Sequence, residues 1–271
     1  MATNSQKKAF LKMSIQVSLD GLSFCILNTE ENTIIYYLKK SFPTRLDPVK
    51  VLEKIEEIYS AEPVLQQTVD EVNLIFSNAL FTLVPSPFFQ EENASSYLKF
   101  NTRILKTDVI AYDELQKHEI VNVYIPFTNI INYFFEKYGE FEYRHSISIL
   151  VEELLKLPAE ETKMYIYNRG KEYDLVVIEK EKLLLCNTFS YETREDFLYY
   201  ILFTAEQLNL DPMELQLMLF GDINRESPLY KIAYTYIRNI DFLNVFFPFD
   251  YKDNVNKPST ETEEYILLKS L

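Results

Sequence analysis

Two stretches of the chain alternate apolar and polar residues in nearly the same way, one near the start and one past the middle. Residues 13–27 and 164–178 each have the pattern of a strand, a tight turn and a second strand, and 151 positions separate them. Residues 33–38 and 182–186 add a third strand to each. Because alternation with a period of two is typical of half-buried strands, the pattern predicts two three-stranded meanders from a duplicated unit.

An amphipathic helix is expected after each meander. Apolar residues recur at helical spacing over 49–58 and 197–208, and Asp47 precedes the first stretch as a capping residue. The rest of the chain predicts strands over 71–76, 79–84, 108–112, 122–126 and 215–220, helices over 129–138, 149–157 and 229–238, and either element over 98–105. The strand over 79–84 is expected to pair with the one before it. Strands that alternate with helices indicate an α/β or mixed α+β fold.

Pro158 and the acidic residues after it separate the two halves of the chain. We expect an enlarged N-terminal lobe over residues 1–158, a C-terminal lobe over 159–250, and a polar tail with one short terminal element over 251–271. A duplicated unit of this kind places a cleft between its two lobes.

Charge and composition narrow the classes of partner. The formal net charge of −14 argues against nucleic acid, whose binding depends on clustered Lys and Arg, and against an anionic membrane surface. No apolar run approaches the ~18 residues of a spanning helix, and no secretory signal is recognised, so a cytoplasmic location is expected. Cys25 and Cys186 lack a C-x-x-C partner and fit free thiols in a reducing compartment. His118 and His145 lack zinc-ligand spacing, and no metal site is predicted.

The repeated strand–turn–strand–strand–helix unit, with a strand, a Gly-Asp pair and a helix near the end, resembles the actin-like ATPase superfamily. This superfamily includes sugar kinases, heat-shock 70 chaperones and pilus-assembly actin homologues, and residues 174–184 are similar to the matching unit of the pilus-assembly branch. Residues 82–89, 97–101 and 187–199 look like an uncharacterised family of unknown function from Bacteroidota. The resemblance implies a duplicated, ribonuclease H-like fold with two lobes, and it assigns no activity.

The resemblance also implies where a nucleotide would bind. Actin-like enzymes hold phosphates with two hairpin turns that carry an acid and glycines, and they hold adenosine with a Gly-Gly pair. The matching positions of this chain supply the candidate residues of the cleft, which are Asp20, Gly21, Gly170, Asp174, Gly221 and Asp222.

These positions depart from the superfamily pattern. Asp20 and Gly21 are adjacent, Asn168 stands where the second turn should have an acid, and Gly221 is a single glycine. The chain has 4 glycines, against roughly 19 at average usage, and glycines let backbone N–H groups close on phosphates. The sequence therefore predicts no nucleotide cofactor. Asp20 and Asp174 could hold a cation if both face the cleft, although a solvated turn and a hydrogen-bonded strand end are the simpler interpretation.

The favoured function is that of a non-catalytic, actin-like binding or scaffold protein, a pseudo-ATPase with a protein partner. The alternative is a divergent ATPase or phosphotransferase that uses Asp20 as its magnesium acid. A third hypothesis is a homodimer formed through surface aromatic residues, because the chain has 20 Tyr and 20 Phe. No catalytic residue is predicted.

Overall fold

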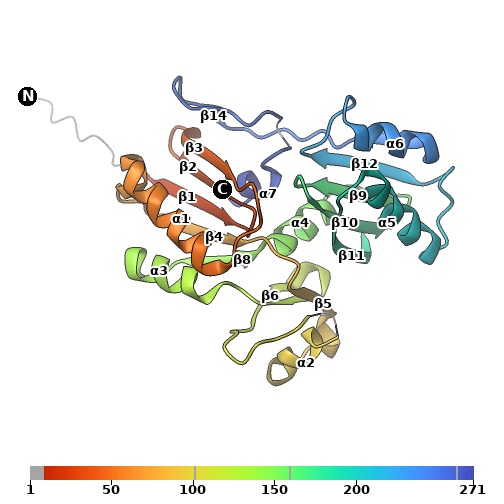
Figure 1. Cartoon of the computed structure of the whole chain (residues 1–271), viewed down its shortest axis with the longest axis horizontal. Coiled ribbons are helices and arrows are strands. Elements are labelled where there is room, and N and C mark those ends of the chain that lie inside the picture. The colour runs from red at the N-terminus through yellow and green to blue at the C-terminus, as the bar shows by residue number, and fades with distance from the viewer. Residues whose placement is uncertain (1–8, 101, 159, 261) are drawn as a thin grey trace, which may run out of the picture.

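The computed structural model describes residues 9–100, 102–158, 160–260 and 262–271, which form two lobes and a smaller sheet beside them (Figure 1). The strands of the first lobe are β1 (Leu11–Val17), β2 (Gly21–Asn28), β3 (Thr33–Ser41), β4 (Glu71–Phe76), β8 (Glu142–His145) and β14 (Asp250–Tyr251). They form one sheet in the order β14-β3-β2-β1-β4-β8. Strands β1, β2 and β3 are the predicted antiparallel meander, and β4 lies parallel to β1.

The second lobe repeats this arrangement. Its strands are β9 (Lys163–Asn168), β10 (Glu172–Glu179), β11 (Lys182–Ser190), β12 (Gln216–Gly221) and β13 (Asn239–Phe242). Their order is β11-β10-β9-β12-β13, and β12 lies parallel to β9 as β4 does to β1. The middle strand of each meander has a register shift, between Ile26 and Leu27 and between Val177 and Ile178, at the same 151-residue offset. A bulge is a local feature that strand order alone does not require. Its presence at the same position in both copies, together with the shared strand order, confirms the predicted duplicated fold.

Helices cover both faces of the first sheet. The longer helices of the chain are α1 (Pro48–Ala61), α3 (Thr128–Tyr138), α4 (Ser146–Leu155), α5 (Arg194–Gln207) and α6 (Pro228–Tyr236), and a short one is α7 (Tyr265–Lys269). Asp47 caps α1 as predicted, because its side chain accepts hydrogen bonds from the first turn. On one face Tyr59 of α1 contacts Met13, and on the other Ser270, just after α7, bonds to Ser14 at 2.8 Å. Met13 and Ser14 are adjacent in β1, so their side chains point to opposite faces of the sheet and contact different helices.

Helices α4 and α7 belong to a core that the two lobes share. In β9, Met164 and Ile166 pack with α5 and α6, whereas Tyr167 turns the other way and meets the ring of Tyr265 in α7 at a centroid distance of 6.3 Å. Residues 265–268 are 3% exposed or less. The chain passes between the lobes twice, from α4 to β9 and from β13 to β14. The short terminal element of the polar tail is therefore a buried helix.

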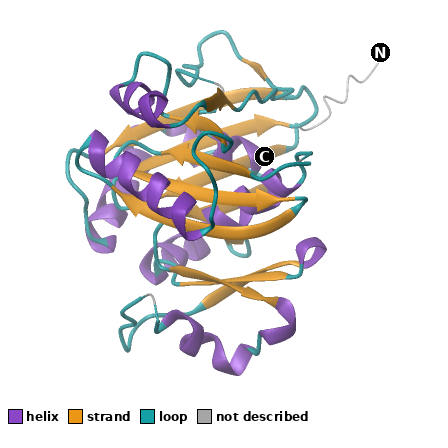
Figure 2. Ribbon diagram, turned by 90° about the vertical axis from the view of Figure 1, so that its right-hand side faces the viewer, coloured by secondary structure: helices purple, strands orange, loops and turns teal. Residues whose placement is uncertain are grey.

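A third sheet belongs to a segment inserted into the first lobe, and Figure 2 shows it below the large sheets. Its elements are β5 (Phe81–Pro85), β6 (Ala111–Leu115), β7 (Ile120–Tyr124), α2 (Ala94–Leu98) and the short 3-10 helices η2 (Ser86–Phe88), η3 (Glu91–Asn93) and η4 (Gln116–His118), and η1 (Pro63–Gln66) follows α1. The predicted strand over 79–84 is β5, but the predicted pairing with β4 is wrong. Both edges of β4 are taken by β1 and β8, and Asn78 turns the chain toward β7 by donating to the carbonyl of Ile125 at 3.1 Å.

A buried polar cluster fixes the inserted sheet to α4. Asp113 of β6 accepts hydrogen bonds from the hydroxyl of Ser148, from the backbone N–H of His145 at 2.9 Å and from the hydroxyl of Tyr124 at 3.0 Å. The His145 ring contacts the rings of Phe81 and Tyr124 at centroid distances of 5.1 and 5.0 Å. Burial lowers the pKa of His145 to about 3, so the imidazole is neutral. The cluster holds the inserted sheet in one orientation on the first lobe.

Candidate functional site

The two hairpin turns of the meanders meet at a cavity between the lobes. The first turn carries Asp20 and the second carries Arg169. Together with side chains from β3 and from the segment before α7, they line a space of about 80 Å³. Pockets for drug-sized ligands measure roughly 300–1,000 Å³. The cavity at the position where the resemblance implies a nucleotide is therefore smaller than a typical ligand pocket.

The structure places the six candidate residues in two groups. The residues that line the cavity are Asp20, Gly21 and Asp222. The other three are Gly170, which lies close to Asp222, and Asp174 and Gly221, which are buried in the second lobe. Gly221 has a φ of +88°, and a Cβ there would collide with the carbonyl oxygen of Asn168. Its role is to let β12 approach β9 closely.

Arg169 is held by a carboxylate within its own lobe. Its Nε and Nη2 lie 3.0 and 3.1 Å from the two carboxylate oxygens of Asp174, and Thr188 Oγ1 donates to the same carboxylate at 2.6 Å. The side chains of Arg169 and Asp174 are 8% and 0% exposed. Burial alone lowers the pKa of the guanidinium, but Asp174 and Glu172 outweigh it and raise that pKa. Asp174 thus neutralises a buried arginine of its own lobe.

Other charges of the cavity come from the tail. Glu263 and Glu264, just before α7, lie 2.7 and 3.2 Å from Lys39 Nζ on β3. Burial raises the pKa of Glu264, and Lys39 opposes part of that shift. The place of these residues at the cavity could not be predicted from the sequence, because Lys39 and Glu263 are 224 positions apart and no local motif marks either one.

Two contacts join the lobes next to the cleft. Arg45 Nη1 lies 2.8 Å from Glu172 Oε1, and Lys171 Nζ donates to the carbonyl oxygen of Pro43 at 3.2 Å. Arg45 and Pro43 follow β3 of the first lobe, whereas Lys171 and Glu172 belong to the second meander. The Arg45 side chain is 53% exposed, so this pair adds little stability. It is nevertheless a direct contact between the two lobes.

A triphosphate in this cavity would meet more acid than base. The lining carboxylates belong to Asp20, Asp222, Glu263 and Glu264. The lining cations are Arg169, Lys39 and Lys40, and the first two are already ion-paired. Like charges that lie close together repel strongly where water is partly excluded. Carboxylates therefore outnumber cations in the lining of the cavity.

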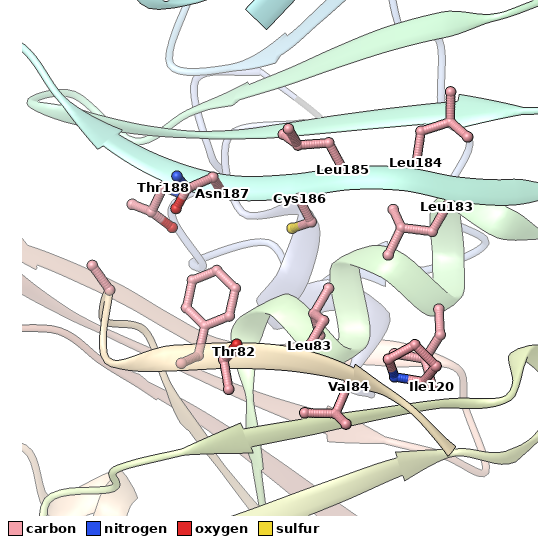
Figure 3. A pocket seen from close by; sticks show the side chains of 13 residues that line it. Thr82, Leu83, Val84, Ile120, Leu183, Leu184, Leu185, Cys186, Asn187 and Thr188 are labelled. Atoms are coloured by element: carbon pink, nitrogen blue, oxygen red, sulfur yellow. The ribbon is translucent and has the colours of Figure 1, made fainter. Parts of the chain in front are cut away.

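A larger cavity lies between β5 of the inserted sheet and β11 of the second lobe, with a volume of about 700 Å³ (Figure 3). We call it the β5–β11 groove. Leu83 points from β5 toward β11, and Leu183 and Cys186 point from β11 toward β5. The groove could not be predicted from the sequence, because the alternation of apolar and polar residues along a strand does not show which other strand it will face.

Comparison with known proteins places the chain in a family. The model of a family described as "Protein of unknown function (DUF3822)" matches residues 2–240. The chain belongs to this family. This confirms the resemblance to a family of unknown function that the sequence predicted.

Solved structures show the fold of this DUF3822 protein. A Bacteroides thetaiotaomicron protein with an actin-like ATPase fold and unknown function is 22% identical over 99% of both chains, with a TM-score of 0.81. A chain of the PilM–PilN type IV pilus biogenesis complex is 11% identical over 95% of this chain and 96% of its own, with a TM-score of 0.58. The search of curated proteins finds no match. The fold is therefore the actin-like ATPase fold. Within the described residues, the model contains no helix with both the length and the apolar character needed to cross a membrane.

Proposed function

We propose that this DUF3822 protein is a non-catalytic, actin-like scaffold that binds a partner protein and hydrolyses no ATP. The observation that carries the proposal is the filled cleft, in which Arg169 is paired with the buried Asp174 and about 80 Å³ of space is left. A protein of the same fold occurs in the PilM–PilN type IV pilus biogenesis complex, which supports a protein as the partner. The fold alone does not assign a function, so the proposal depends on the small cavity and its ion-paired lining.

Thermal unfolding with and without millimolar Mg-ATP tests this proposal. We expect the same melting temperature in both, because the cavity of about 80 Å³ is small for a triphosphate and its lining carboxylates outnumber its lining cations. Ligand binding at about a hundredfold excess over Kd would add about 2.7 kcal/mol to the free energy of unfolding. For a chain of this size, that would raise the melting temperature by roughly 5–10 °C. A saturable rise of this kind would overturn the proposal.

The alternative of a divergent ATPase or phosphotransferase has one observation in its favour, since Asp20 and Gly21 do line the cleft cavity. It predicts that the rise with Mg-ATP disappears in Asp20→Ala and persists in Glu136→Ala, a control at an exposed position of α3. A rise that persists in both variants would place the nucleotide elsewhere on the surface.

A further inference from the structure

The β5–β11 groove is lined without a charged side chain. Its 13 lining residues are Ala79, Phe81, Thr82, Leu83, Val84, Pro85, Ile120, Leu183, Leu184, Leu185, Cys186, Asn187 and Thr188. Charged residues make up 25% of the whole chain, so their absence from this lining is a distinct property of the groove. A charge brought into such surroundings would lose water without gaining a charged partner, which is unfavourable. The lining therefore selects an occupant that is itself uncharged.

Both walls of the groove are strands at the end of a sheet. β5 ends the order β5-β7-β6, and β11 ends the order β11-β10-β9-β12-β13. An end strand has a row of backbone N–H and C=O groups that its own sheet leaves unpaired. An extended peptide can satisfy such groups with its own backbone, whereas an aliphatic chain cannot. The groove thus offers backbone pairing beside apolar side chains.

The two walls are held in place before any partner arrives. On the β5 side, the ring of Phe81 rests on the buried ring of His145, which belongs to the cluster that fixes the inserted sheet. On the β11 side, Thr188 donates to Asp174, which also holds Arg169. A pre-formed site loses less entropy on binding than one that must be assembled.

We propose that the β5–β11 groove binds an extended, uncharged segment of a partner protein as an added strand. The segment would place about five residues along the wall, since β5 spans Phe81–Pro85 and a strand rises about 3.3 Å per residue. Apolar side chains of the segment would face Leu83 and Leu183. This inference rests on the proposed scaffold function and names the class of partner.

The test is a selection from a phage-displayed library of random peptides on the immobilised whole chain, followed by fluorescence anisotropy with the selected peptides. Three variants are compared with the unmodified protein. Ala79→Arg and Asn187→Arg add a long charged side chain at exposed positions of the groove, and Val49→Arg adds one at an exposed position of α1. Circular dichroism and melting temperatures establish that each variant is folded.

We expect the selected peptides to share an uncharged, apolar stretch. Their affinity should fall by about tenfold or more in both groove variants and stay unchanged in Val49→Arg. Peptides that bind the groove variants as tightly as the unmodified protein would overturn the inference and leave the scaffold function standing. Selection of charged peptides, or of none, would also overturn it. A dimer in light scattering that Asn187→Arg dissociates would show that a second copy covers the groove. A rise in melting temperature with Mg-ATP would instead refute the proposed function itself.

Discussion

Replacement of Arg169 by methionine should destabilise the protein strongly. The variant keeps an unbranched side chain but removes the donors at 3.0 and 3.1 Å from Asp174. The Asp174 carboxylate, 0% exposed, would keep Thr188 Oγ1 as a side-chain donor. Breaking a buried ion pair in this way costs about 3–5 kcal/mol. For a chain of this size, the melting temperature should fall by roughly 10 °C.

Urea and thermal unfolding of Arg169→Met, Asp174→Asn and the double variant measure the effect. The double variant buries no unpaired charge, so it should recover about 2 kcal/mol relative to Arg169→Met alone. Arg194→Met is the matched control, because Arg194 and its partner Glu195 are 57% and 62% exposed and such pairs contribute at most about 1 kcal/mol. A loss of stability in Arg169→Met that is no greater than the loss in Arg194→Met would refute the stabilising role of the buried pair.

Three further changes test the fold around the site. The pKa of His145 is lowered to about 3 in the folded protein and is near 6.5 in the unfolded chain, so the unfolded state binds a proton first as the pH falls. The free energy of unfolding should therefore be lower by about 2 kcal/mol at pH ~5 than above pH ~6.5. Urea unfolding of His145→Gln should lack this decrease. Leu267→Ala in the shared core should cost about 2–5 kcal/mol, and a loss below 1 kcal/mol in the same assay would show that α7 is not part of the core. Gly221→Ala should melt lower than Gly139→Ala, because an added Cβ collides with Asn168 at the first position and meets nothing within 4 Å at the second.

The predicted meanders and helices are confirmed because they depend on residues close in sequence. Asp47 and the apolar positions after it contain the whole signal for α1. The pairing of β5 could not be predicted in the same way, since two apolar strands separated by Ser77 and Asn78 have the pattern of a hairpin. The outcome depends on β8, which occupies the free edge of β4 from about seventy positions away along the chain.

The residues of the candidate site likewise differ in whether a local sequence signal marks them. Asp20 and Gly21 could be placed at the cleft because they belong to a recognisable turn. Arg169 could not be given a role, because an arginine in a turn is ordinarily exposed and only the fold shows it 8% exposed against Asp174. The groove was beyond sequence reasoning for the same reason, since its walls come from two different sheets.

The two copies of the repeat differ in the charge that their turns bring to the cleft. In the superfamily pattern both turns hold phosphates, so a ligand joins the lobes. Here the first turn carries Asp20 and the second carries Arg169, and Asp20 adds to the rise in the pKa of that guanidinium. These opposite charges and the contact between Arg45 and Glu172 join the two lobes at the cleft. Because β5 belongs to the first lobe's insertion and β11 to the second lobe, the same closure sets the width of the β5–β11 groove, so the filled cleft and the open groove are two consequences of one arrangement.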